Sequence, residues 1–182
     1  MMHVLVPLAQ GCEELEAITI IDLLVRAGIK VTTAGLDASP VVASRGTTII
    51  ADTQIQNVQD EQFDMVVLPG GLPGADHLRD SAIIQAILQR HANADKYVAA
   101  ICAAPKALAH AGLLENKVAT SYPGVLEELA LKNTQIKNTA LEVDGKIITS
   151  RGPGTAMDFS LKLIELLEGE EKRNEVEKAL VR

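Results

Sequence analysis

Aromatic side chains are scarce in this 182-residue sequence, which has two Phe, two Tyr and no Trp. Basic residues are in the minority as well, with 17 Lys and Arg against 24 Asp and Glu and a formal net charge of -7. Because phosphate backbones attract basic surfaces and unpaired bases stack on aromatic rings, this composition argues against nucleic acid as a partner. No apolar run reaches the length that a membrane crossing needs, so we expect no membrane partner.

Cysteine is also rare, and only Cys12 and Cys102 are present. The first apolar run has no basic segment before it and is followed at once by Glu13 and Glu14, unlike a signal peptide. Two cysteines without a secretory signal predict free thiols in a cytoplasmic protein rather than a disulfide framework. The Cys and His spacings match no metal site and no phosphate-binding glycine loop is present, so the sequence predicts neither a metal nor a cofactor.

The length and the 47% hydrophobic content predict one domain over residues 1–182. Short apolar runs alternate with stretches of helical periodicity, which predicts an α/β fold with a mostly parallel sheet covered by helices on both faces. The expected strands are 4–9, 30–36, 41–43, 47–50, 64–69, 97–102, 117–121 and a hairpin over 139–150. The expected helices are 13–27, 81–91, 103–110, 123–131, 155–168 and 170–181, with Thr155 and Asp158 spaced like a capping box.

Binding sites in such sheets lie beyond the carboxyl ends of the strands, and Cys102 stands at one of these ends. Small alanines flank it and permit a tight strand-to-helix turn that resembles a nucleophile elbow. Free N–H groups and the positive end of the following helix would favour the thiolate there. Cys102 is therefore a candidate nucleophile, and the alternative is a buried structural thiol.

Glu16 borders an apolar face, because Ile20, Leu23 and Leu24 follow it at helical spacing. Burial of this carboxyl would raise its pKa, so that the neutral acid could donate a hydrogen bond to a thiolate at Cys102. It could then also give and accept a proton during a reaction. The alternative is a glutamate in the first helical turn that complements the helix dipole.

Three further features lie in turns after strands. Gly70 and Gly71 would let backbone N–H groups approach an oxyanion, although glycine after a strand also suits an ordinary turn. His77, in a predicted loop, could reach the same edge of the sheet or be a solvated histidine. Cys12 is a candidate resolving thiol for Cys102 or an isolated small hydrophobic residue.

Four segments occur in an order that is more specific than any single motif: Glu13-Glu14-Leu15-Glu16, Leu68-Pro69-Gly70-Gly71, Ala99 to Pro105, and Ser150 to Thr155. Together with Arg26 to Thr32 and Ser44-Arg45-Gly46 they span nearly the whole chain. The chain thereby resembles the ThiJ/PfpI superfamily, and within it the DJ-one branch, a Parkinsonism-associated deglycase-like group.

The resemblance implies a flavodoxin-like three-layer sandwich that usually forms a homodimer. It matches Cys102 to the reactive cysteine, Glu16 to a protonated glutamate and Gly70 and Gly71 to the oxyanion-binding turn. Our own hypothesis is that the backbone amides of Gly71 and Ala103 hold the oxyanion. The branch has been assigned cofactor-free conversion of methylglyoxal or glyoxal to hydroxy acids and deglycation of early adducts. Peroxide sensing through a cysteine sulfinate and holdase chaperoning in the oxidative stress response are its other assigned roles.

This sequence departs from the resemblance at Tyr122, since many members of the branch carry a histidine near the cysteine. We treat Tyr122, Arg45, His77 and Cys12 as candidate pocket residues. The protease-like branch has a histidine directly after its cysteine where this chain has Ala103, so a peptidase or amidase is the weakest alternative.

We expect a cofactor-independent enzyme of the glyoxalase III or protein deglycase type, with small α-oxoaldehydes or glycated adducts as partners. In this hypothesis a Cys102 thiolate forms a hemithioacetal and Glu16 shuttles the proton. The alternative is a peroxide-responsive sensor or holdase that acts through a Cys102 sulfinate.

Overall fold

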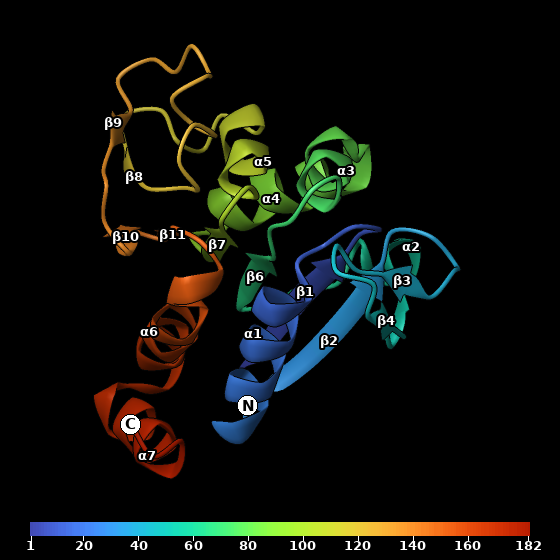
Figure 1. Ribbon diagram of the computed structural model, residues 1–182, viewed down its shortest axis with the longest axis vertical. Coiled ribbons are helices and arrows are strands. Elements are labelled where there is room, and N and C mark those ends of the chain that lie inside the picture. Colours follow the sequence, from blue (N-terminus) through green and yellow to red (C-terminus); the bar gives the residue numbers. More distant parts are fainter.

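A seven-stranded sheet forms the centre of the computed structural model, which describes residues 1–182 (Figure 1). Its strands are β1 (His3–Leu8), β2 (Lys30–Gly35), β5 (Thr53–Gln54), β6 (Met65–Leu68), β7 (Tyr97–Ile101), β10 (Leu141–Asp144) and β11 (Ile147–Ser150). The order across the sheet is β10-β11-β7-β6-β1-β2-β5. All neighbouring strands are parallel except the edge pair β10 and β11, which is antiparallel. The predicted mostly parallel sheet is confirmed.

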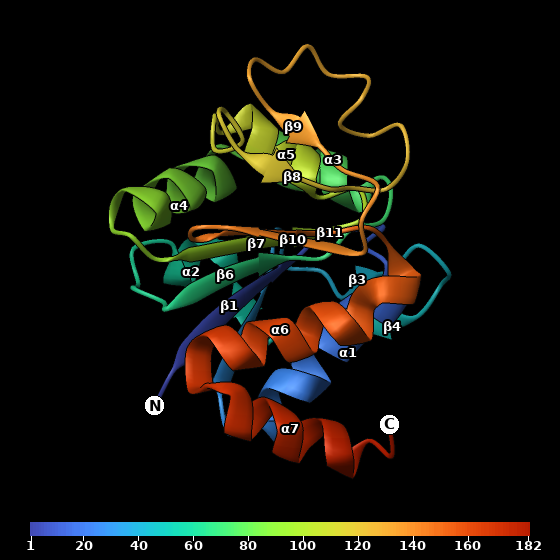
Figure 2. The same cartoon turned by 90° about the vertical axis from the view of Figure 1, so that its left-hand side faces the viewer.

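Helices cover both faces of this sheet, as Figure 2 shows with the sheet seen nearly edge-on. One face carries α1 (Glu14–Arg26), α6 (Ala156–Glu168) and α7 (Glu170–Ala179). The opposite face carries α3 (Gly74–Asp80), α4 (Ala82–Asn93) and α5 (Pro105–His110), and a short helix α2 (Ile55–Val58) follows β5. The structure is therefore the expected flavodoxin-like three-layer sandwich.

Alternation along β1 explains why both faces of the sheet are apolar. Val4, Val6 and Leu8 belong to the core cluster that contains the buried faces of α1 and α6, whereas Leu5 belongs to the cluster on the α4 and α5 side. Successive side chains of a strand point to opposite faces, so a strand buried on both faces reads as a continuous apolar run. All of these side chains are fully buried.

Two small pairs of strands lie outside the main sheet. The antiparallel pair β3 (Val41–Val42) and β4 (Thr48–Ile49) forms the predicted hairpin around Ser44 to Gly46. The second pair, β8 (Val118–Ala119) and β9 (Gln135–Ile136), is parallel and places the loop after β8 near the end of β7.

Three local predictions were wrong. The segment 123–131 forms turns instead of a helix, and Gly124 within it adopts a left-handed φ of 88°. Helix α3 occupies what was expected to be a loop, so His77 lies on a helix. Thr155 forms no side-chain cap to α6, because its hydroxyl bonds to Ser150 Oγ at 2.7 Å and to the backbone of Gly152.

The strand order places a topological switch point at β1. The chain passes from β1 to β2 on one side and later returns to β6 on the other side. Crevices in open α/β sheets form at such points, outside the carboxyl ends of the strands. The turns after β1, β6 and β7 therefore meet at one edge of the sheet.

Candidate active site

Cys102 occupies a strained turn between β7 and α5. Its φ is 64°, in the left-handed region that residues other than glycine adopt at a cost of about 1 kcal/mol or more. Its N–H donates to the carbonyl of Ser150 at 2.9 Å, and its own carbonyl accepts from the N–H of Tyr122 at 2.8 Å. Ala103 and Ala104 are buried behind it, so small side chains are needed there. Such a turn projects the thiol away from the sheet, as at a nucleophile elbow.

Glu16 is fully buried in the first turn of α1. The N–H of Gly70 donates to its Oε2 at 2.7 Å, whereas Oε1 is buried and has no nitrogen or oxygen partner. Burial raises the pKa of the Glu16 carboxyl to about 7, although the Cys102 thiol and the Gly70 N–H partly offset this effect. A proton on Glu16 is therefore present in a substantial fraction of molecules at neutral pH.

The Cys102 thiol and the Glu16 carboxyl form one coupled pair. Burial and then the negative charge of Glu16 raise the pKa of the Cys102 thiol, while the backbone N–H groups of Gly71 and Ala103 lower it. The contribution from Glu16 exists only while that carboxyl is ionised. Protonation of Glu16 thus removes one obstacle to ionisation of the sulfur and leaves the two N–H groups to stabilise its charge.

Gly70 and Gly71 allow the turn after β6 to approach this pair. A Cβ on Gly70 would lie 2.6 Å from the Cβ of Cys102 and 2.7 Å from Oε2 of Glu16. Gly71 has a φ of 90°, and a Cβ there would collide with the backbone of Glu13. Any other residue type would push the turn away from the thiol, so the glycines are required by close approach.

Cys102 lines a cavity of about 380 Å³, and the residue is 8% exposed. The cavity wall is contributed by the starts of α1 and α5, the β3–β4 hairpin and the loops after β6, β8 and β11. The lining residues are Glu13, Ser44, Arg45, Gly71, Leu72, Cys102, Ala103, Tyr122, Val125 and Pro153. Glu16 lies beneath this wall, so a small molecule can reach the sulfur while the carboxyl stays dry.

Two of the four candidate pocket residues line this cavity and two do not. Arg45 and Tyr122 are both on its wall, and Tyr122 is 51% exposed. His77 is exposed on α3 and lies outside the lining. Cys12 is fully buried, and burial raises the pKa of its thiol to about 11, which makes it a poor partner for thiol exchange. Both cysteines are free thiols.

Sequence reasoning missed several wall residues, namely Glu13, Ser44, Leu72, Val125 and Pro153. Ser44 is next to Arg45, and Leu72 follows Gly71. The sequence therefore identified the two segments that contribute Ser44 and Leu72, although it did not identify these two residues. Val125 lies in the region 123–131 that was expected to be helical, and the wrong expectation hid its position. No periodicity signals such a residue, because its place depends on how the loop after β8 folds back over Cys102.

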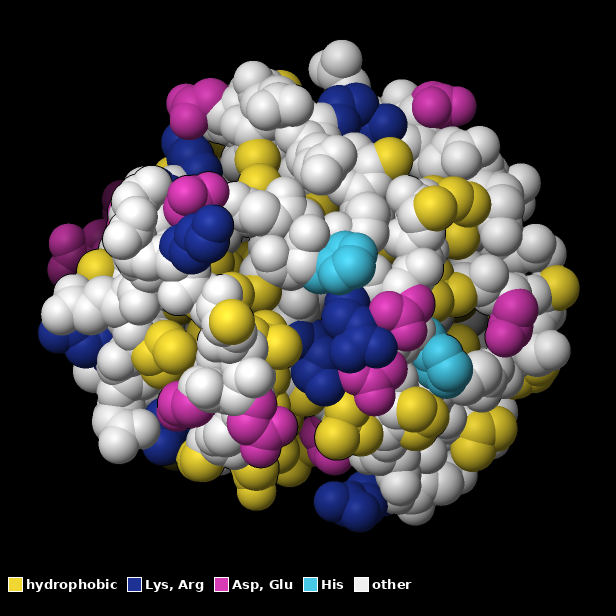
Figure 3. Space-filling view, turned by 90° about the horizontal axis from the view of Figure 1, so that it is seen from above, with side chains coloured by type: hydrophobic (Ala, Val, Ile, Leu, Met, Phe, Trp, Pro, Cys, Tyr) yellow, Lys and Arg dark blue, Asp and Glu magenta, His cyan; other side chains and the backbone are white.

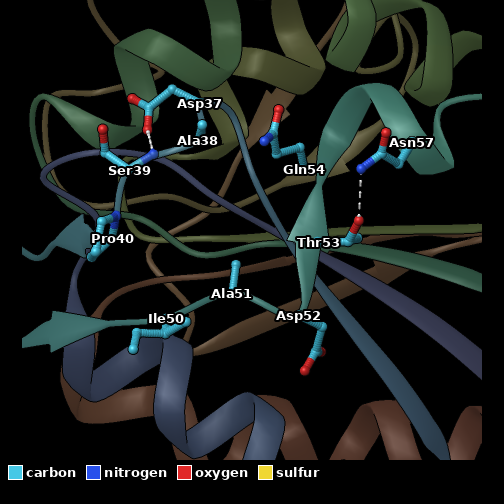
Figure 4. Close-up of a pocket in the computed structure, with 10 residues that line it drawn as sticks. All are labelled: Asp37, Ala38, Ser39, Pro40, Ile50, Ala51, Asp52, Thr53, Gln54 and Asn57. Atoms are coloured by element: carbon cyan, nitrogen blue, oxygen red, sulfur yellow. Dashed lines mark hydrogen bonds between the residues drawn. The ribbon is translucent and has the colours of Figure 1, made fainter.

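A second pocket of about 350 Å³ lies at the edge strand β5 (Figure 4). Its wall is drawn in Figure 4 and comprises Asp37, Ala38, Ser39, Pro40, Ile50, Ala51, Asp52, Thr53, Gln54 and Asn57. Oδ1 of Asp37 accepts from the N–H of Ser39, and Oδ2 of Asp52 accepts from the N–H and hydroxyl of Thr33. This pocket contains no thiol and no buried carboxyl without a partner.

Outside these pockets, the charged side chains of α3 and α5 form surface ion pairs. Asp76 accepts from Arg79 at 3.2 Å and from Lys106 at 2.9 Å. Figure 3 shows histidine side chains beside grouped basic and acidic side chains on the face seen from above.

No group of three or more His, Cys, Asp or Glu side chains is arranged to hold a metal ion. None of the helices has the length and hydropathy to cross a membrane.

Comparisons of the whole chain with known proteins identify its family. The sequence profile of the DJ-1/PfpI family matches residues 2–166. The chain belongs to this family. The predicted resemblance is thereby confirmed.

Two relatives illustrate the similarity within the DJ-1/PfpI family. Protein dj-1beta from Drosophila melanogaster is 44% identical over 178 residues, which are 97% of this chain and 95% of that protein. Glutathione-independent glyoxalase DJR-1.2 from Caenorhabditis elegans is 34% identical over 171 residues, 94% of this chain and 91% of that protein. The crystal structure of Drosophila melanogaster DJ-1beta matches with a TM-score of 0.95 and 43% identity, covering 99% of this chain and 97% of that one.

Proposed function

We propose that this protein is a cofactor-independent, cysteine-dependent enzyme that acts on methylglyoxal, glyoxal or their early glycation adducts. The observation that carries the proposal is the pair of a cavity-facing thiol and a buried carboxyl whose pKa is raised to about 7. Such a carboxyl can exchange a proton at neutral pH, as glyoxalase III or deglycase chemistry requires. The similarity to a protein named as a glutathione-independent glyoxalase supports the same class of substrate.

The first step is addition of the Cys102 sulfur to the aldehyde carbon. A carbon–sulfur bond forms, the carbonyl π electrons move to oxygen, and the oxygen ends with the proton that the thiol–carboxyl pair held. The backbone N–H groups of Gly71 and Ala103, which already contact the sulfur, are positioned to stabilise developing negative charge. The product of this step is a hemithioacetal.

The second step moves hydrogen from the former aldehyde carbon to the neighbouring carbonyl carbon. Ionised Glu16 accepts the proton from the first carbon, and the electron pair forms an enediolate. The hydroxyl proton of the first carbon passes to the oxygen of the second carbon, and Glu16 returns its proton to the second carbon. The first carbon is oxidised to a thioester and the second is reduced to an alcohol, so no external oxidant is needed. Water then cleaves the thioester and releases lactate or glycolate with a restored thiol.

The same geometry supports a second candidate, a peroxide-responsive sensor or holdase. Peroxide would oxidise Cys102 to a sulfinate, to which the proton on Glu16 Oε1 would donate a hydrogen bond. The observation in its favour is that Oε1 is buried without a nitrogen or oxygen partner. A sensor differs from an enzyme in kinetics, because oxidation is stoichiometric whereas dicarbonyl turnover saturates and continues.

The homodimer that the resemblance implies and the cytoplasmic location that the cysteine content predicts remain predictions of this proposal. Helix α1 presents a surface that suits a homodimer, since Leu15, Ile18 and Val25 are about half exposed on it. These side chains recur at spacings of three and seven residues and therefore share one side of the helix.

The test of the proposed function is lactate production from methylglyoxal, followed by proton NMR. We expect Cys102→Ala to lower the rate by about 1000-fold or more, because the covalent intermediate cannot form. Cys12→Ala is the matched control, since it removes a thiol that does not line the cavity, and it should keep wild-type turnover. Turnover by Cys102→Ala at the wild-type rate would refute the enzyme. Stoichiometric oxidation of Cys102 by peroxide, without dicarbonyl turnover, would favour the sensor.

A further inference from the structure

The tip of the β3–β4 hairpin carries Arg45 to the mouth of the Cys102 cavity. Each strand of this hairpin is two residues long and pairs with no strand outside the hairpin. Isolated two-stranded hairpins are marginally stable in water, so strands this short do not fix the position of their loop. The tip needs contacts from elsewhere to hold Arg45 in place.

The N–H of Ser44 donates to the carbonyl of Cys12 at 2.8 Å, and the carboxylate of Glu14 supplies four further contacts. The N–H of Arg45 donates to Oε1 at 3.0 Å and to Oε2 at 3.1 Å, and the N–H of Thr47 donates to Oε1 at 3.4 Å. The hydroxyl of Ser44 donates to Oε2 at 3.2 Å. One carboxylate at the start of α1 therefore accepts hydrogen bonds from three residues of the tip, Ser44, Arg45 and Thr47. Hydrogen bonds to a charged acceptor are stronger than those to a neutral one.

Arg45 is the only basic residue on the cavity wall, and its guanidinium forms no ion pair within the protein. The other charged wall residue is Glu13, whose Oε2 accepts from the hydroxyl of Ser44 at 2.9 Å. Without Arg45 the mouth would be negative in a chain whose net charge is already -7, and it would repel anions. An arginine without an ion pair, on the wall of the cavity that also contains a reactive thiol, is suited to bind a carboxylate.

We infer that Glu14 is a positioning residue that holds Arg45 on the wall of the Cys102 cavity, and that Arg45 selects aldehydes that carry a carboxylate next to the reactive carbon. The inference rests on the proposed function and adds to it a preference for acidic aldehydes and acidic glycation adducts over neutral ones. It assigns a role to the β3–β4 hairpin, which the chemistry at Cys102 and Glu16 does not use.

Glyoxylate and glycolaldehyde are matched probes for this inference. Both offer an aldehyde carbon to which the sulfur can add reversibly, with the proton passing to the aldehyde oxygen, and neither has a second ketone or aldehyde to which hydrogen can move. Glyoxylate carries a carboxylate and glycolaldehyde a neutral hydroxymethyl group. Their affinities follow from protection of Cys102 against iodoacetamide, a readout that needs no turnover.

We expect Arg45→Met to weaken glyoxylate about three- to tenfold relative to glycolaldehyde, the range typical of one exposed charge pair. Lys132→Met is the matched control, because it removes one exposed positive charge that does not line the cavity. It should leave the ratio of the two affinities unchanged. An unchanged ratio in Arg45→Met would overturn the role of Arg45.

The variant Glu14→Gln separates a positioning effect from a charge effect, since the two predict opposite changes in the affinity for glyoxylate. Loss of a negative charge near the cavity would by itself strengthen glyoxylate binding. Loss of the contacts to the hairpin tip should instead weaken it, by about two- to fivefold, as hydrogen bonds to the tip are lost. In the Arg45→Met background the same substitution should no longer weaken glyoxylate. Stronger binding by Glu14→Gln would overturn the positioning role.

The outcome is separable from that of the proposed function. Arg45-dependent binding of glyoxylate with no conversion of methylglyoxal would defeat the enzyme and leave the recognition of carboxylates standing. Conversion of methylglyoxal, together with the same ratio of glyoxylate to glycolaldehyde affinity in wild type and Arg45→Met, would support the enzyme and defeat the recognition of carboxylates.

Discussion

The two pockets at the carboxyl edge of the sheet are similar in size and differ in what is buried beneath them. The Cys102 cavity measures about 380 Å³ and the pocket near Asp37 and Asn57 about 350 Å³. Beneath the first lies a carboxyl with an unpartnered oxygen, whereas Asp37 and Asp52 at the second accept hydrogen bonds from Ser39 and Thr33. The first pocket adjoins the switch point at β1, and the second adjoins an edge strand. The two pockets are therefore distinguished by a buried polar atom without a partner rather than by their volumes.

The largest test of this contrast exchanges a carboxylate for an amide in each pocket. Glu16→Gln should lower methylglyoxal turnover by about 100-fold or more, because the amide cannot accept and return a proton. Asp37→Asn makes the same change in the second pocket and should leave turnover within about twofold, as expected for an exposed site remote from the chemistry. Steady-state kinetics at pH 7 measure both. Equal losses in the two variants would mean that the contrast between the pockets has no functional content.

Part of this contrast could be predicted from the sequence and part could not. The small residues around Cys102 and the glycines after β6 indicate a tight turn and a close approach by local chemistry alone, and the structure has both. The covering loop over Cys102 was mispredicted as a helix, because its position depends on contacts with distant segments. Helix α3 was missed since it begins with Gly74, a poor helix former whose missing side chain is required by packing against Cys12.

The thiolate expected at Cys102 illustrates the same limit. Helix position alone favours ionisation, and the N–H groups of Gly71 and Ala103 act in that direction. Burial and the proximity of Glu16 are tertiary properties. Burial opposes ionisation in either state of Glu16 and the charge of Glu16 opposes it further, so the pKa of the thiol is raised overall, contrary to the local expectation. The local pattern therefore identifies the nucleophile, and the three-dimensional arrangement decides when it is active.

A smaller effect should follow from filling the space at Gly70. Its Cβ would lie 2.6 Å from Cys102 Cβ and 2.7 Å from the carbonyl of Ile101, so Gly70→Ala should destabilise the fold by about 2 kcal/mol through overpacking. The matched control is Gly154→Ala, where a Cβ meets nothing within 4 Å. Urea unfolding of both variants gives the comparison. Equal urea midpoints for Gly70→Ala and Gly154→Ala would show that the turn can accommodate a Cβ at position 70 without loss of stability.

The smallest effect is a pH dependence of stability that comes from Glu16. Burial raises its pKa from 4.5 to about 7, so the folded protein binds more protons than the unfolded chain between these values. Stability should therefore decrease as pH rises through this window, by about 1 kcal/mol between pH 6 and 7. Glu16→Gln cannot ionise and should lose this component, as urea midpoints at several pH values will reveal. An identical pH slope in wild type and variant would place the carboxyl outside the dry site.

The left-handed backbone at Cys102 has a consequence for how such a chain can change over generations. Glycine would occupy the same φ without strain, yet it would abolish the thiol. Selection for the chemistry thus keeps a residue that the fold alone would disfavour. A lineage freed from that selection is expected to drift towards glycine at this turn and to become slightly more stable as it loses its reactivity.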